Sequence, residues 1–223
     1  PTHELSPPFT GETVHALYRQ GDRLLALGDA LSLWDVSQPA YPALFATLPL
    51  DFAGRHIDPA PGGNWLLSTE TGLVIAHRDG DTLTEIGSLL TLDPVDRAVQ
   101  IGGRGYLAMH SGGLLIADLS DPAHPVSLFS FASESGRYVR DLYQLDDGHL
   151  LVSWEGGVAV LDVSAPSAVP RLAGIVPLGA QATSIHIAPD GKRAALGLGD
   201  QGAALLDLSD PRQPTLAGQV ETP

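Results

Sequence analysis

The sequence predicts an all-β fold, a β-propeller of five blades with four antiparallel strands in each blade. Three observations predict it. A short apolar segment recurs five times along the 223 residues. Hydrophobic residues make up 43% of the chain and charged residues 17%, with 25 Gly and 18 Pro, a composition typical of many short strands joined by tight turns. No segment repeats apolar residues at helical spacing over several turns, and this excludes a TIM barrel.

The recurring segment is an apolar run followed by Asp, Leu or Val, Ser, any residue and Pro. Four copies have this form: Ala30–Pro39, Gly113–Pro122, Gly157–Pro166 and Gly202–Pro211. In a degenerate copy, Gly72–His77, His77 takes the place of the aspartate. Successive marker positions are 42, 41, 44 and 45 residues apart. This spacing is the length of a four-stranded propeller blade.

These segments resemble LVIVD repeats, and the resemblance covers residues 10–220. It implies a β-propeller and an extracytoplasmic protein of bacterial or archaeal origin, and it implies little about activity. We predict one domain over residues 1–223. Its approximate blades are 10–51, 52–93, 94–135, 136–179 and 180–223.

The third repeat illustrates the strands expected in each blade. They are residues 98–101, 106–109, 113–119 and 126–131. The aspartate before each Ser-x-Pro turn is expected to brace that turn, because its side chain can accept hydrogen bonds from the turn backbone. The last repeat has a fourth strand of its own at residues 215–220, and His3 to Phe9 is a candidate additional outer strand.

Net charge and residue usage exclude several classes of function. The formal net charge is −14, which repels phosphate backbones and anionic lipid headgroups, so we expect no nucleic-acid partner. The chain has no cysteine and therefore no disulfide or thiolate site. It has no apolar run long enough to cross a bilayer, and we expect no membrane insertion. Because the chain begins with Pro1, we expect a processed or trimmed product.

A ring of basic and imidazole side chains is the most informative polar pattern. In a propeller, the first strand of each blade lines the central channel. Aligned on their second strands, four repeats place such a side chain near the start of the first strand. The residues are His15, His56, Arg97 and Arg140. In the fifth repeat the position falls at Ser184 or, allowing for turn length, at His186.

Two interpretations of this ring remain open. Converging cations can hold a carboxylate or phosphate through charge-assisted hydrogen bonds. Alternatively, the ring is structural and its members bond neighbouring acids such as Asp58, Asp96 and Asp141. We favour the structural interpretation.

Loops between the second and third strands add side chains at the same edge. The possible loop contacts are Glu70, His110, Trp154 and Asp200. Trp154 can present a stacking surface, or it can pack between blades. Trp34 and Trp65 lie inside expected strands and are assigned to the core.

The leading hypothesis is a non-enzymatic binding or assembly scaffold without a cofactor or catalytic residues. Its partner would be a protein, other domains of a larger protein, or a small anion at the channel mouth. The first alternative is an enzyme or metal-binding domain that uses His15, His56 and His186. Two arginines in the ring would repel a cation, so we assign no metal. A sugar-binding lectin using Trp154 is the second alternative.

Overall fold

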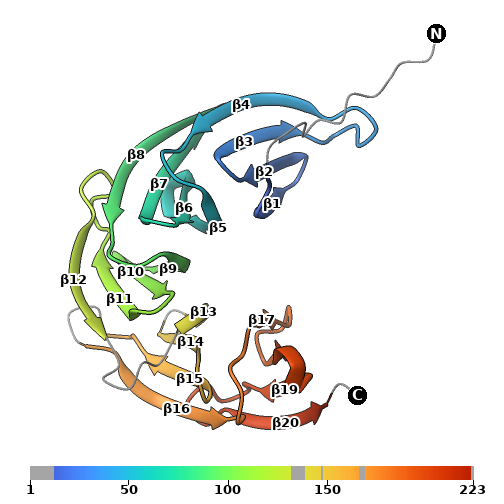
Figure 1. The fold of residues 1–223 in the computed structure, drawn as a ribbon, viewed down its shortest axis with the longest axis vertical. Helices are drawn as coiled ribbons and strands as arrows, with labels where there is room; N and C mark the ends of the chain where they lie inside the picture. The colour runs from blue at the N-terminus through green and yellow to red at the C-terminus, as the bar shows by residue number, and fades with distance from the viewer. Residues whose placement is uncertain (1–12, 132–138, 147, 166–168, 222–223) are drawn as a thin grey trace. The chain divides into compact units, whose positions relative to one another are not determined.

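The computed structural model describes residues 13–131, 139–146, 148–165 and 169–221. These residues form five antiparallel sheets, each of four strands in simple sequential order (Figure 1). The first two sheets are β1 (Ala16–Gln20), β2 (Arg23–Leu27), β3 (Ala30–Asp35) and β4 (Ala43–Pro49), then β5 (Gly54–Ala60), β6 (Asn64–Thr69), β7 (Gly72–Asp79) and β8 (Thr82–Leu90). The third is β9 (Val95–Ile101), β10 (Arg104–Met109), β11 (Gly113–Asp118) and β12 (Val126–Phe131). The last two are β13 (Val139–Asp146), β14 (His149–Trp154), β15 (Gly157–Asp162) and β16 (Arg171–Pro177), then β17 (Ser184–Ile187), β18 (Arg193–Gly197), β19 (Ala203–Asp207) and β20 (Thr215–Val220).

This architecture confirms the prediction of five four-stranded blades. The expected strand at residues 215–220 is β20. In the third blade the first strand begins earlier than expected, at Val95, whose β-branched side chain is fully buried. The candidate strand at His3 to Phe9 lies outside the described residues. Within the described part of the chain, no helix has the length and apolar character needed to cross a membrane.

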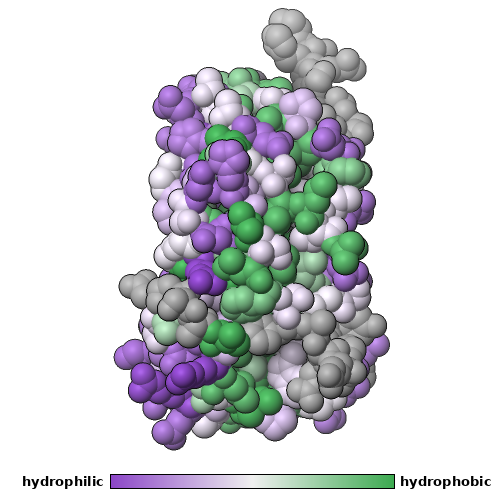
Figure 2. All heavy atoms as spheres, turned by 90° about the vertical axis from the view of Figure 1, so that its left-hand side faces the viewer, coloured by the Kyte–Doolittle hydropathy of each residue, from purple (hydrophilic) through white to green (hydrophobic). Residues whose placement is uncertain are grey.

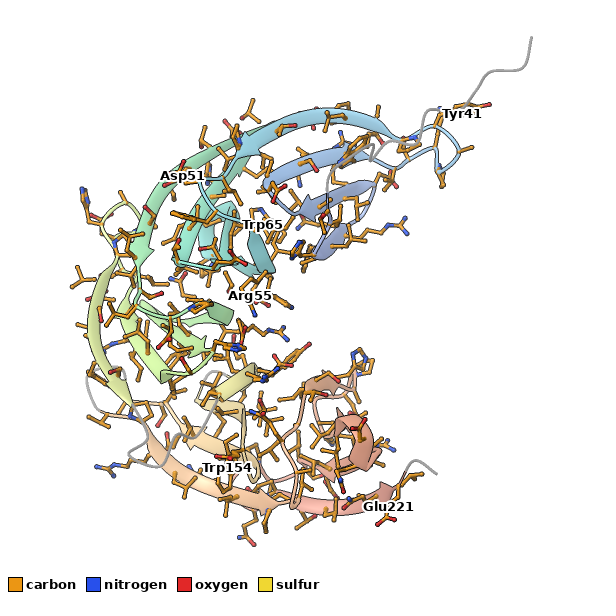
Figure 3. The ribbon with its side chains drawn as sticks, in the orientation of Figure 1. Tyr41, Asp51, Arg55, Trp65, Trp154 and Glu221 are labelled. Atoms are coloured by element: carbon orange, nitrogen blue, oxygen red, sulfur yellow. The ribbon has the colours of Figure 1, made fainter. Side chains whose placement is uncertain are left out.

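The chain divides into two compact units, residues 1–95 with 122–124 and residues 96–121 with 125–223. In the first unit, the sheets β1–β4 and β5–β8 pack face to face. The core side chains of this pair are Leu25, Leu27, Leu31, Leu33, Ile57, Trp65, Leu67 and Ala76. Tyr18 meets the Trp65 ring edge-on at 4.7 Å between centroids. Trp34 and Trp65 are 7% and 4% exposed, which confirms their assignment to the core. Trp65 is labelled in Figure 3.

In the second unit, sheet β13–β16 is covered on both faces. One face packs on sheet β9–β12 through residues that include Ile116, Leu142 and Leu150, and the other packs on sheet β17–β20 through residues that include Val160 and Leu206. Burial on both faces explains why the third strands read as continuous apolar runs rather than alternating ones.

The repeated aspartates bind the turns that follow them, as expected from the sequence. Asp118 Oδ1 accepts hydrogen bonds from the Ser120 amide at 2.9 Å and the Ser120 hydroxyl at 2.6 Å. Asp162 makes the same pair of contacts with Ser164 at 3.0 and 2.6 Å. The serine hydroxyl and amide lower the pKa of both carboxyl groups, because they stabilise the ionised form.

Each repeat aspartate also faces a basic residue on the neighbouring strand, which the sequence pattern does not reveal. The first residue of the second strand pairs across the hairpin with the last residue of the third strand. The pairs are Arg23 with Asp35, Arg104 with Asp118, His149 with Asp162 and Arg193 with Asp207. In the degenerate repeat the pair is Asn64 and His77, whose side chains share a hydrogen bond of 2.8 Å. A hydrogen bond between Asn64 and His77 thus takes the place of the pair that contains the aspartate in the other repeats.

Candidate functional site

In each sheet, the start of the first strand and the turn between the second and third strands lie at the same end of the strands. In the first unit, the His15 amide donates to the Leu27 carbonyl at 2.8 Å, and the Glu70 amide donates to the Ala53 carbonyl at 3.3 Å. In the second unit, the Thr183 amide donates to the Gly197 carbonyl at 2.8 Å. We refer to this side of each unit as the channel edge.

In the first unit, the channel edge carries His15, His56 and Glu70. His15 and Glu70 are exposed. His56 is half-buried on β5, and its Nδ1 atom lies 3.0 Å from Oδ2 of the buried Asp58. His56 therefore has the acidic partner that the structural interpretation of the ring expects.

In the second unit, Arg97 is buried and contacts two side chains of the neighbouring sheet. It is 8% exposed, and its Nη1 atom donates to Asp141 Oδ1 at 3.0 Å. Its guanidinium carbon lies 3.7 Å from the centroid of the Tyr143 ring, in cation–π geometry. Arg97 is on β9, and both partners are on β13, so this side chain joins two sheets.

Asp141 continues the connection to the next sheet. Its Oδ2 atom accepts a hydrogen bond from the Ile185 amide on β17 at 3.0 Å. Its Oδ1 atom also accepts from the Leu142 amide at 2.9 Å. One carboxylate thus binds a guanidinium on one side and a backbone amide on the other, and links three consecutive sheets of the second unit.

Arg140 lies beside this network but does not join it. The register of β13 shifts between Val139 and Leu142, and the Asp141 amide donates to the Ser153 hydroxyl at 2.9 Å. Asp141, rather than Arg140, therefore takes the position that contacts the neighbouring sheets. Arg140 is exposed and, among the described residues, it forms no hydrogen bond or ion pair.

His186 is the corresponding exposed group on β17. It pairs in register with Ala195, two residues after Ser184, which pairs with Gly197. Its side chain is exposed, and within the described parts of the chain it has no hydrogen-bonding partner. Arg140 and His186 are each one residue away from the hydrogen bond between Asp141 and Ile185, so that bond holds their strands side by side.

The remaining loop candidates are separate from one another. His110 Nδ1 lies 3.0 Å from Asp96 Oδ2, and the histidine side chain is 39% exposed. Asp200 is exposed in the short 3₁₀ turn Gly199–Gln201. Trp154 ends β14 in the fourth sheet and is half-buried (Figure 3).

Among the residues that the structure describes, no three His, Asp or Glu side chains are grouped as metal ligands. The second unit offers exposed cationic and imidazole groups at its channel edge, on Arg140 and His186, as well as the exposed Asp200. Arg140 can donate two parallel hydrogen bonds to a carboxylate, and His186 can donate a further one when protonated.

A family model for the LVIVD repeat matches residues 101–133, 144–177 and 194–222 of the chain. These three segments fall in the third, fourth and fifth blades, and they bear out the resemblance seen in the sequence. A search of the curated proteins finds no match.

Solved structures with the same fold share little sequence with the chain. The β-propeller domain of Cps50 (Swd1) from Myceliophteria thermophila is 14% identical with a TM-score of 0.73, over 95% of this chain and 73% of that one. Saccharomyces cerevisiae Sqt1 is 11% identical with a TM-score of 0.71, over 94% and 62% of the two chains. The computationally designed Ika8 protein is 11% identical with a TM-score of 0.70, over 93% and 61%. The chain therefore spans about three fifths of the length of Sqt1 and Ika8, and the likeness shows that its fold is a β-propeller.

Proposed function

We propose that this LVIVD-repeat β-propeller is a non-enzymatic binding scaffold that holds a carboxylate of a protein partner at the channel edge of its second unit. The observation that carries the proposal is the contrast between two neighbouring arginines. Arg97 is buried and bound to Asp141, whereas Arg140, which precedes Asp141, and His186, which follows Ile185, are exposed. Only the second pair is available to a partner.

The charge of the protein supports a small contact of this kind. With a net charge of −14, the surface as a whole repels anions, so an extended acidic or phosphate-rich partner is disfavoured. A single carboxylate needs only two or three local donors, which Arg140 and His186 supply. The hydrogen bond between Asp141 on β13 and Ile185 on β17 fixes the backbone positions of both donor residues before a partner binds. This lowers the entropic cost of binding.

The experiment compares a ligand that carries a carboxylate with the corresponding neutral amide. N-acetylglycine and N-acetylglycinamide are titrated separately into ¹⁵N-labelled protein at pH 6, and the Arg140 and His186 resonances are followed by NMR. We expect saturable shifts at both residues with N-acetylglycine and none with the amide. The substitution Arg140→Gln should weaken binding at least about tenfold, since it removes a charged, bidentate donor.

Arg171→Gln is the matched control, because Arg171 is also an exposed arginine on a strand of the second unit. This variant should bind N-acetylglycine as the wild type does. Equal shifts with the amide, or equal loss of binding in the Arg171 variant, would show that the response is not a carboxylate site and would overturn the proposal.

The extracytoplasmic location implied by the LVIVD resemblance is part of the same proposal. It rests on that resemblance alone. Fractionation of the source cells with an antibody against the protein tests it, and recovery of the protein with a cytoplasmic marker enzyme would contradict it.

A further inference from the structure

A second site lies in the same unit, in an apolar pocket of about 260 Å³ that the sequence pattern does not predict. Its described lining comes from β11 and from all four strands of the fourth sheet, together with Pro170. The principal lining side chains are Leu114, Val152, Trp154, Leu161, Leu172 and Ile175.

The chemistry of this lining is uniform. Every described lining residue is aliphatic or glycine, apart from Trp154, whose indole nitrogen is the one heteroatom among their side chains. A ligand bound here therefore meets methyl groups and an aromatic face, and it finds no charged partner. Burying a charged or strongly polar group in such surroundings without hydrogen bonds is costly, so the lining selects for a neutral apolar ligand.

The side chains at the mouth of the pocket are also apolar. Leu172 and Ile175 are on β16, the outer strand of the fourth sheet, and they are 62% and 45% exposed. Val126 and Leu128 on the outer strand β12, which do not line the pocket, are 54% and 40% exposed, and apolar side chains are visible on the outer face that carries this strand (Figure 2). Exposed apolar groups around a hollow commonly mark a binding site.

The size of the pocket limits what can enter. An apolar cavity of about 150 Å³ in another protein accommodates benzene, and drug-sized ligands occupy pockets of about 300 Å³ and above. The pocket is between these values. Its walls are hydrogen-bonded strands, and the β14–β15 pairing is regular from His149 to Trp154, so the hollow is held open by backbone structure.

We propose that this pocket binds a small neutral molecule with one aromatic ring, stacked against Trp154. Aromatic pairs add to the transfer of the ring out of water when the rings meet face-offset or edge-on. A sugar would need several hydrogen-bonding side chains, which the described lining does not supply.

The test uses toluene as the neutral aromatic probe and methyl β-glucoside as the sugar probe, with methyl-labelled protein and NMR detection. We expect toluene to shift the methyl resonances of Leu161, Leu172 and Ile175 in a saturable way, and methyl β-glucoside to leave them unchanged. Neither probe carries a charge, so the result is independent of the carboxylate site at Arg140 and His186.

Two substitutions of Ala159, which lines the pocket on β15, locate the binding. Ala159→Leu partly fills the hollow and Ala159→Phe fills it with a ring, and each should weaken toluene binding at least about tenfold. The control is Ala203→Leu, at an exposed alanine on the third strand of the next sheet, which should change the affinity less than about twofold. Circular dichroism and thermal unfolding verify that each variant is folded.

Absence of saturable methyl shifts with toluene in the wild type would overturn the proposal. So would toluene binding of equal strength in the folded Ala159→Leu variant, because the probe would then occupy another place. Shifts produced by methyl β-glucoside at the same methyl groups would instead identify the pocket as a sugar site.

Discussion

The buried guanidinium of Arg97 is the residue on which the inner side of the second unit most depends. Its side chain is 10% exposed and that of Asp141 is 14% exposed, so the pair is largely removed from water. Asp141 has two amide donors besides Arg97, from Leu142 and Ile185. The charge of each side chain compensates the cost of burying the charge of the other. Removal of one side chain leaves the charge of the other buried without its oppositely charged partner.

We expect Arg97→Met to lower the free energy of unfolding by about 3 to 5 kcal/mol, the usual cost of breaking a buried pair from one side. The methionine keeps apolar contact with Tyr143 but cannot neutralise Asp141. Urea unfolding followed by circular dichroism measures the change. Arg140→Met, at an exposed arginine on the neighbouring strand, should change it by less than about 0.5 kcal/mol. A loss below about 1 kcal/mol for Arg97→Met would mean that Asp141 is adequately paired by backbone amides alone.

The sequence could predict that basic residues begin the first strands, but not which of them is buried. The alignment placed Arg140 at the position of Arg97. The structure instead places Asp141 there, because an extra residue is accommodated between Val139 and Leu142. A β-bulge reverses the faces of the residues that follow it. Nothing in the local sequence marks this bulge, since it is determined by the pairing with β14.

At the scale of the strand, glycine at the start of the third strand fixes how closely the fourth strand can approach. Gly72 and Gly157 have φ angles of +151° and +147°, which side chains rarely adopt. A Cβ atom on Gly157 would lie 2.2 Å from the Val176 carbonyl oxygen of β16, and one on Gly72 would lie 2.0 Å from the Leu89 carbonyl oxygen. The second and fourth blades therefore need glycine here for space as well as for conformation, whereas the first blade has Ala30.

We expect Gly157→Ala to destabilise the protein by about 2 kcal/mol or more, from backbone strain and the clash with the Val176 carbonyl. Chemical denaturation with urea gives the magnitude. Gly218→Ala on β20 is the matched control, because nothing lies within 4 Å of the Cβ it would add. That substitution should be neutral or slightly stabilising. If both variants unfold at the wild-type urea midpoint, the third and fourth strands can move apart enough to accommodate the added methyl group.

Strand positions were predictable where turns have strong chemical signatures, and β20 and β12 both begin and end at the expected residues. The residues that pair across a hairpin were harder to predict from the sequence. The basic residue that faces each repeat aspartate is Arg23, Arg104, His149 or Arg193, and its type and spacing vary between repeats. The pairing becomes evident only when the hairpin register is known.

At the scale of the whole molecule, acid residues act in two opposing ways. Each adds to a net charge of −14, and this self-repulsion destabilises the compact state at neutral pH. However, the turn aspartates of four blades are stabilised in their ionised form. Serine partners lower the pKa of Asp35, Asp118, Asp162 and Asp207. Folding therefore favours their deprotonated state.

The two effects predict a stability maximum near the isoelectric point of about 4.7. As the pH falls from 7 toward 5, carboxylates elsewhere begin to take up protons, self-repulsion weakens, and the urea midpoint should rise. Below about pH 4, the ordinary value for aspartate, the unfolded chain binds protons at the turn aspartates more readily than the folded protein does. Their contribution is then lost as the pH falls further toward the lowered pKa values, and net positive charge adds repulsion.

Urea midpoints measured from pH 7 to pH 3 test this shape, and a variant isolates the turn contribution. The triple substitution Asp118→Asn, Asp162→Asn and Asp207→Asn removes three groups with lowered pKa values. It should be less stable than the wild type at pH 6, and it should lose less stability than the wild type between pH 4 and pH 3, because asparagine does not titrate. Parallel curves for the two proteins below pH 4 would mean that acid unfolding is driven by general charge repulsion and not by the turns.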